Sequence, residues 1–487
     1  MKSVRIIAAI LAALSMLVVF AACANPGDST SDTTTPADQL DTTTPAPSSG
    51  DTTDAETTMS PLTVPDDLKF TGKTFTIFTW SNQTQWEWDA DQMSGELLSD
   101  AVYNRKLSTE ERFGITINIK KQPGEWDNRN SFIQAVAASV LTNSHAYDLV
   151  GQYTPAAAIG TMQSLYTNLK DVDHLNLNSS WWPGDIAESS AINGKLYFVT
   201  GDITPTLIRN MGTIMANLDM TESLGLEDVY ELVDSGKWTL EKLKELALGR
   251  VSLDGAEQMY GLTMPNNVVY DNFFYSGGFK YVTVEADGAI RMSDDISSER
   301  LINWFKACQS LLNDNADVAI VAVNQAFTTE QAIFHAGSVA DVQNYLKDVE
   351  FDFAILPFPK YDETQKDYAT IVGFWVSMYS IPIDVSDESM SGAVLEVLGY
   401  EGATNLTPAF YEDAFQYRYL GTEINARMFD LLHDTLVFDT GRTFADQISC
   451  FAAFRQAANI GVDWASYSTS QKKIWNRNIN AMYDKLG

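Results

Sequence analysis

The loop at residues 80–89 combines flat aromatic and polar side chains, and these residue types suggest a binding chemistry. It contains Trp80, Asn82, Gln83, Trp86 and Trp88. Sugar rings present apolar CH faces that stack on tryptophan or tyrosine, while their hydroxyls need hydrogen-bonding partners in the ring plane. Because surface loops rarely expose three tryptophans, we expect Trp80 to face a cleft, with Asn82 and Gln83 as polar partners. Trp86 and Trp88 either join it or pack under a neighbouring helix.

Strands and helices predicted around this loop form an α/β sheet. Strands are predicted at residues 73–80, 115–120 and 147–150, and helices at about 95–113 and 131–141. This β-α-β-α-β order argues for a parallel sheet with helices on both faces. Ligands collect beyond the carboxyl ends of such strands, which here are residues 80–86 and 151–155.

A second block of elements follows from residue 193 onward. Its predicted parts are an apolar strand at 211–218, a helix from 240 to 247, a strand within 351–359 and an apolar segment at 371–377. Thr239 is placed to cap the helix and Gly249 to end it. The folded remainder of about 420 residues is too long for one core, so two domains are expected.

The N-terminus has the pattern of an export signal. Lys2 and Arg5 precede an apolar run at residues 6–22, which ends in small residues before Cys23. This arrangement resembles a bacterial lipobox; the alternative is a transmembrane anchor, for which 17 residues are at the short limit. We therefore predict a signal peptide at 1–22 and a lipidated cysteine with a disordered Thr-, Ser- and Pro-rich linker at 23–67.

Charge and side-chain chemistry exclude several functions. The formal net charge of −32 repels nucleic acid and anionic membranes, so neither is expected as a partner. Cys308 and Cys450 are far apart in sequence and either form a disulfide or are buried as small apolar residues. The four histidines are isolated, so no metal site is expected, and no nucleotide fingerprint or nucleophile elbow points to a cofactor or catalytic residue.

Short segments spread along the chain resemble a known family. They are residues 147–150, 193–198, 236–239, 277–278, 327–337 and 356–359, together with the lipoprotein-like start. Their order and spacing are similar to those of extracellular solute-binding proteins of ABC importers, and most of all to the carbohydrate-binding family 1, which includes maltose-binding proteins. The resemblance covers residues 70–384.

This resemblance implies a two-lobed, periplasmic-binding-protein-like α/β fold with hinge crossings and a ligand cleft between the lobes. The crossings are expected near residues 200–205, 370–376 and 437–443. The first lobe would then combine residues 68–200 and 376–437. The second lobe would combine residues 204–371 and 443–487.

The resemblance also adds candidate ligand contacts to those from the aromatic loop. They are Tyr153 after the third strand, Asn267 and Tyr270 before the glycine pair, Asp202 and Arg209 beside the first crossing, and Trp375 in the second crossing. For Arg209 the alternative to a ligand contact is an ordinary salt bridge, and for Trp375 it is packing in the hinge.

The function expected from these features is capture of a small solute, with a mono- or oligosaccharide foremost, by a monomer. The protein would be lipid-anchored on the extracellular face of the cell membrane and would deliver its ligand to ABC permease subunits. No catalytic residues, cofactor or metal are expected. The alternatives are a secreted glycoside hydrolase, which needs two carboxylates about 5–10 Å apart, and a glycan-binding adhesin.

Overall fold

The computed structural model describes residues 59–250, 258–266, 268–313, 315–415 and 423–487. Residues Thr58–Gly487 form one compact unit, to which the description below applies. The predictions for residues 1–58, among them the export signal and Cys23, lie outside the described residues.

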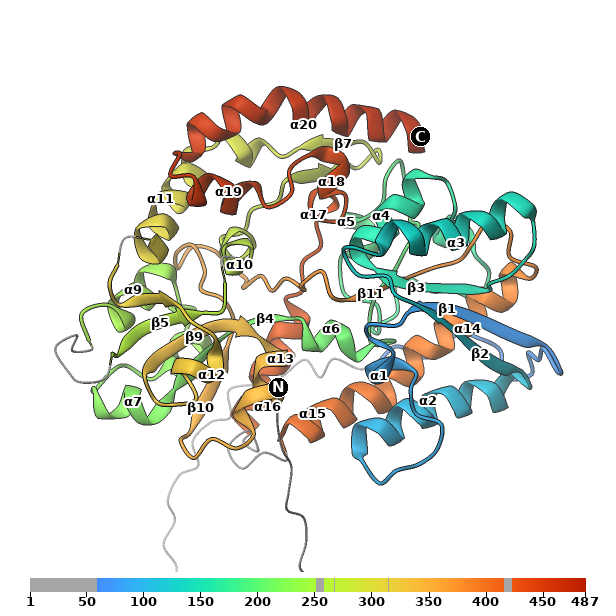
Figure 1. Ribbon diagram of the computed structural model, residues 1–487, viewed down its shortest axis with the longest axis horizontal. Helices are drawn as coiled ribbons and strands as arrows, with labels where there is room; N and C mark the ends of the chain where they lie inside the picture. Colours follow the sequence, from blue (N-terminus) through green and yellow to red (C-terminus); the bar gives the residue numbers. More distant parts are fainter. Residues whose placement is uncertain (1–58, 251–257, 267, 314, 416–422) are drawn as a thin grey trace, which may run out of the picture. The chain divides into compact units, whose positions relative to one another are not determined.

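The first sheet has the strand order β11-β3-β1-β2 (Figure 1). Its strands are β1 (Thr74–Trp80), β2 (Thr116–Gln122), β3 (Leu149–Tyr153) and β11 (Ser377–Ser380). The strands β1, β2 and β3 are parallel, as predicted, whereas β11 joins β3 in the antiparallel direction. Every residue of β3 is buried, because strands lie on both of its sides and helices cover its faces.

The second sheet has the order β10-β4-β9-β5-β8. Its strands are β4 (Gly212–Asn217), β5 (Tyr260–Met264), β8 (Val318–Ile320), β9 (Ala332–Ser338) and β10 (Phe353–Leu356). The pairs of β4 with β9 and β10 are antiparallel, and those of β5 with β8 and β9 are parallel. A separate hairpin pairs β6 (Val282–Val284) with β7 (Ile290–Met292).

Helices cover both sheets. The elements before β8 are α1 (Thr84–Glu87), α2 (Leu97–Phe113), α3 (Arg129–Thr142), α4 (Thr154–Met162), η1 (Leu169–Asp171), α5 (Ile186–Ser189), α6 (Pro205–Arg209), α7 (Leu218–Ser223), α8 (Val229–Asp234), α9 (Leu240–Ala247), α10 (Val269–Ser276), η2 (Asp294–Ser297) and α11 (Glu299–Asn313). Those after it are α12 (Val323–Ala326), α13 (Val339–Asp341), η3 (Val342–Leu346), α14 (Glu388–Glu401), η4 (Gly402–Leu406), α15 (Thr407–Phe415), α16 (Glu423–Asp434), α17 (Thr440–Thr443), α18 (Ala445–Ile448), α19 (Ala453–Asn459) and α20 (Trp464–Leu486). As predicted, the Thr239 side chain accepts a hydrogen bond from the Lys242 amide and caps α9.

Two connecting segments lead from one sheet to the other. Residues 203–211 carry α6 into β4, and residues 371–376 lead into β11. The two segments are bridged at Met211 and Val372, and Thr370 pairs with Leu436 of a third stretch. This architecture confirms the predicted two-lobed α/β fold with crossings between the lobes.

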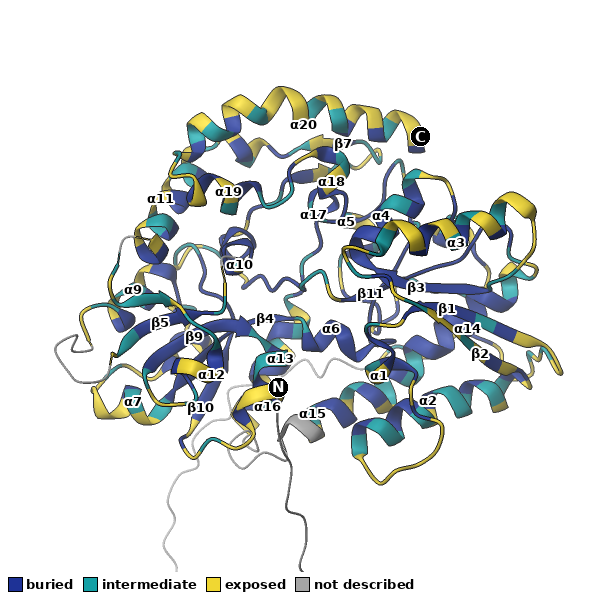
Figure 2. Ribbon diagram, in the orientation of Figure 1, coloured by how far each residue is buried: buried dark blue, intermediate teal, exposed yellow. Residues whose placement is uncertain are grey.

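The C-terminal third is divided between the two sheets. Helices α14 and α15 pack on α2 of the first lobe. Residues 423–434 were also expected in the first lobe, but they form α16, which packs on β10 of the second sheet. That packing favours a lobe boundary before α16. Helix α20 lies along β7 and η2 and buries one face, while its outer face is exposed (Figure 2).

Two further expectations concern membranes and cysteines. Among the described residues, no helix combines the length and the hydrophobicity that crossing a bilayer requires. Cys308 and Cys450 are both buried free thiols rather than partners in a disulfide. Burial raises the pKa of each thiol well above its usual range.

Candidate functional site

Three aromatic side chains meet at the carboxyl edge of the first sheet. Trp80 ends β1, Tyr153 ends β3 and Trp375 precedes β11, so the strand order brings them together. Their ring centroids are 5.2 Å (Trp80 to Tyr153), 5.7 Å (Trp80 to Trp375) and 6.1 Å (Tyr153 to Trp375) apart. Trp375 is 45% exposed, whereas Trp80 and Tyr153 are buried behind it. We call these three residues the aromatic wall; Trp375 presents its accessible surface.

The loop after β1 turns inward instead of exposing its tryptophans. Trp88 is buried, with the Arg105 guanidinium 4.3 Å from its ring centroid. Trp86 is half-buried under the guanidinium of Arg209, at 3.7 Å. Both tryptophans therefore stack on cations contributed by other helices, α2 and α6.

The two polar residues of this loop are also engaged within the protein. The Asn82 side-chain oxygen accepts a hydrogen bond from the Gly124 amide at 3.1 Å. Gln83 is 8% exposed. A ligand role for either side chain stays a prediction.

Two residues expected from the resemblance lie in other surroundings. Asp202 is buried, accepts a hydrogen bond from the Thr407 hydroxyl at 2.8 Å and lies 3.3 Å from the His433 ring nitrogen. Tyr270 is fully buried, and its hydroxyl donates to Asn313. Asn267 lies outside the described residues. Sequence order located these segments but could not determine the direction of each side chain.

A polar cavity of about 150 Å³ lies beside the aromatic wall, on the second lobe. Its polar lining consists of Asn210, Asn266, Asp271, Asn272, Ser338, Asp341 and Arg442. The Asn210 side-chain amide donates to the Trp375 carbonyl oxygen at 3.0 Å and so joins the cavity to the wall. Sequence reasoning missed these residues because they come from four separate segments; only Arg442 lay in a predicted crossing.

Glycine at two positions keeps the cavity open. A Cβ atom at Gly212 would lie 2.8 Å from the Asn272 side-chain oxygen. At Gly337 it would lie 2.5 Å from an Asp341 carboxylate oxygen. Larger residues there would displace the polar groups that line the cavity.

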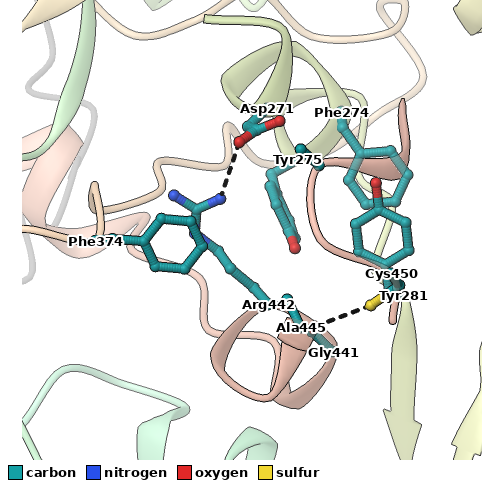
Figure 3. A pocket seen from close by; sticks show the side chains of 10 residues that line it. Asp271, Phe274, Tyr275, Tyr281, Phe374, Gly441, Arg442, Ala445 and Cys450 are labelled. Atoms are coloured by element: carbon teal, nitrogen blue, oxygen red, sulfur yellow. Dashed lines mark hydrogen bonds and ion pairs between the residues drawn. The ribbon is translucent and has the colours of Figure 1, made fainter. Parts of the chain in front are cut away.

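Charged groups in the lining are paired. The Arg442 guanidinium lies 3.6 Å from the Asp271 carboxylate and stacks over the Phe374 ring at 4.1 Å (Figure 3). Arg455 lies 3.8 Å from the same carboxylate. Burial raises the pKa of Asp271, and the two guanidinium groups oppose this shift. Burial also raises the pKa of Asp341, against hydrogen bonds from Ser338.

The wall and the cavity together offer an exposed indole beside amide, hydroxyl, carboxylate and guanidinium groups. This combination suits a small molecule that has an apolar face and several hydroxyl groups. Within the described ranges, no group of three or more His, Cys, Asp or Glu side chains is arranged to hold a metal ion.

Solved structures with this fold include several sugar-binding proteins. A cyclo/maltodextrin-binding protein complexed with maltotetraose has a TM-score of 0.56 and 13% identity, covering 85% of this chain and all of its own. A cyclic α-maltosyl-1,6-maltose-binding protein from Arthrobacter globiformis has a TM-score of 0.56 and 12% identity, covering 84% and 99%. An ABC substrate-binding protein from Listeria monocytogenes in complex with cycloalternan has a TM-score of 0.52 and 13% identity, covering 84% and 99%. No protein-family model and no curated protein matches the sequence.

Proposed function

We propose that this chain is the substrate-binding component of an ABC importer, which captures a mono- or oligosaccharide by closure of its two lobes. The observation that carries the proposal is the aromatic wall of the first lobe beside the polar cavity of the second. An exposed Trp375 can stack on a sugar ring, while Asn210, Asn272 and Asp341 can bond its hydroxyls. The sugar-binding proteins that share this fold support the same interpretation.

The finer parts of the proposal concern location and partners. The protein acts as a monomer, is anchored at the extracellular face of the cell membrane through a lipid on Cys23, and passes its ligand to permease subunits. It binds without turnover, whereas a secreted glycoside hydrolase would release products and a glycan-binding adhesin would work without a permease. The lipobox-like start and the linker-like composition of residues 23–67 support the anchoring.

The test combines a carbohydrate screen with one variant of the wall. We expect Trp375→Ala to weaken binding of a sugar found in the screen by about fivefold to a hundredfold, because stacking and burial of one ring contribute about 1 to 3 kcal/mol. Its ligand-free melting temperature should change little, since the side chain is half-exposed. Calorimetry measures the affinity, and small-angle scattering should show a smaller radius of gyration with ligand.

Two controls accompany this variant. Tyr345 is 43% exposed and lies outside the cavity lining, so Tyr345→Ala should bind like the parent protein. Trp80→Ala, which removes a fully buried side chain, should lower the ligand-free melting temperature by several degrees. Parent-like binding by Trp375→Ala would contradict the proposed site. Cleavage of the bound sugar would contradict the proposed role.

A further inference from the structure

Glu87, the last residue of α1, is a fully buried carboxylate that accepts hydrogen bonds from the first connecting segment and from β11, the strand that follows the second segment. On the first segment, its Oε1 accepts hydrogen bonds from the hydroxyls of Thr204 and Thr206, the latter at 3.1 Å. On the strand that follows the second segment, the Tyr379 hydroxyl donates to its Oε2 at 3.3 Å. A single side chain therefore ties the first connecting segment to the strand that the second segment enters.

The same hydrogen bonds reach the aromatic wall. The Ser377 amide donates to the Thr206 hydroxyl oxygen at 3.1 Å. The Trp80 indole N–H donates to the Ser377 hydroxyl oxygen at 2.7 Å. Trp80 in turn packs against Trp375, so direct contacts connect the exposed indole to Ser377 and Thr206.

Neighbouring side chains extend these contacts to the second lobe. Trp86, which precedes Glu87, stacks under the guanidinium of Arg209 from α6. Arg209 donates a hydrogen bond to Gln343 of η3 and lies near Asp341, whose charge opposes the lowering of the Arg209 pKa by burial. Asp341 lines the polar cavity. The short helix α1 thus contacts the first connecting segment and β11 directly, and Arg209 links it to η3 of the second lobe.

A carboxylate in the protein interior is costly unless hydrogen bonds and a nearby cation compensate for its lost hydration. Arg105, itself fully buried, donates to the backbone oxygens of Ile203 and Glu87 and holds α1 against the first connecting segment. A helix of four residues has too few internal hydrogen bonds to be stable alone. The position of α1 therefore depends on this network.

We infer that Glu87 is a positioning residue that fixes the angle between the two lobes and couples that angle to the aromatic wall. The inference shares one assumption with the proposed function, namely that the angle between the two lobes changes. A ligand that displaces Trp375 acts through Trp80 and Ser377 on the Thr206–Glu87 pair. Arg209 then carries the change to Gln343 and Asp341.

The test measures the interlobe distance in ligand-free protein, so it does not depend on knowing the ligand. Spin labels are attached at Leu141→Cys on the first lobe and Ile320→Cys on the second, both at exposed positions, in the full chain carrying Cys23→Ser. The buried Cys308 and Cys450 are protected from the reagent. We expect Thr206→Val and Glu87→Gln to broaden or shift the distance distribution, while Thr206→Ser, which keeps the hydroxyl, restores the parent distribution.

The matched control is Glu396→Gln. Glu396 is as deeply buried as Glu87 and accepts hydrogen bonds from Ser179 and Trp182 at 3.0 Å, but all three lie within the first lobe. This variant should lose stability without changing the interlobe distance. Thr206→Val with a parent-like distribution overturns the inference, and so does Glu396→Gln with the same broadening.

A second measurement separates this inference from the proposed function. For a sugar that binds the parent, Thr206→Val should alter affinity by at least about fivefold, the range of typical coupling energies, without touching the ligand. If no sugar binds the parent while Thr206→Val still changes the distance distribution, the proposed function fails and the inference stands. If sugar binds parent and variant equally and the distances are unchanged, only the inference fails.

Discussion

His433, the penultimate residue of α16, has a strongly raised pKa. Burial would lower this pKa, but the carboxylates of Asp202 and Asp434 outweigh the effect and raise it to about 10. Asp202 also accepts a hydrogen bond from Thr407 of α15. A charged imidazole therefore joins α16 to Asp202, which directly precedes the first connecting segment, and through Asp202 to α15.

The interaction of protonated His433 with Asp202 predicts a loss of stability in alkaline solution. The folded protein binds the His433 proton more tightly than the unfolded chain does, so the stabilisation is complete below about pH 6.5 and is lost as the pH rises through about 10. We expect the parent to lose more unfolding free energy between about pH 7 and pH 10.5 than His433→Gln does, as measured by urea titration. His174→Asn is the control and should follow the parent. Parallel pH curves for the parent and His433→Gln would contradict this assignment.

Residues near the ends of predicted strands could be located from sequence, but their surroundings could not. The β-α-β-α-β order was enough to bring Trp80 and Tyr153 to one edge, and the resemblance added Trp375. The inward turn of Trp86 and Trp88 depends on Arg209 and Arg105, which approach from other helices. No local pattern records such a contact. The polar cavity was missed for the same reason, since its lining combines isolated residues from separate segments.

Among the secondary-structure elements, those with strong local signals were predicted well. The strands β1, β2 and β4 and the helices α2, α3 and α9 lie within a few residues of their predicted positions. The packing of α16 on the second sheet was not predicted, because an amphipathic pattern indicates that one face is buried but not which sheet covers it. The chain after α16 is held in place by a buried side chain, that of Asp439.

Asp439 attaches the segment before α17 to α10 and β6. Its carboxylate accepts hydrogen bonds from the amides of Gly441, Tyr281 and Val282 at 2.7, 2.8 and 3.2 Å, and from the Tyr275 hydroxyl at 2.9 Å. Asp439→Asn places an amide N–H against these donors, so we expect a loss of at least about 2 kcal/mol of unfolding free energy. Urea unfolding measures this loss of unfolding free energy. Asp463→Asn, at the exposed cap of α20, should lose less; equal losses would mean that Asp439 acts only as a helix cap.

At the scale of the whole molecule, the folded unit begins near residue 58 and carries most of the acidic charge of the chain. Its candidate site is built entirely from residues of that unit. We therefore expect the proposed anchor at Cys23 to set where the unit works without changing its affinity for the ligand.

Because the proposed anchor and the candidate site lie in different parts of the chain, a variant at Cys23 should change location and leave ligand binding intact. Cys23→Ser should release the protein into the medium or stall its processing, because the thiol is the proposed attachment point for lipid. The same variant should keep the parent's affinity for any sugar found in the screen. Cell fractionation with N-terminal sequencing checks the location, and Ser29→Ala in the predicted linker should remain with the membrane. A processed Cys23→Ser chain that stays membrane-bound would exclude lipid attachment at this residue.

The interleaving of the two sheets has a consequence for biosynthesis. Strand β11 covers the outer edge of β3, yet it is translated after every strand of the second sheet. A chain emerging N-terminus first from the ribosome, or from a translocation channel, therefore keeps that edge of β3 without its native partner until residue 380 has appeared. Such a late, long-range pairing is slow and leaves an unpaired strand edge open to misassociation. Delayed folding suits the proposed export across a membrane as an extended chain, because the sheet of the first lobe cannot be completed until residue 380 has crossed.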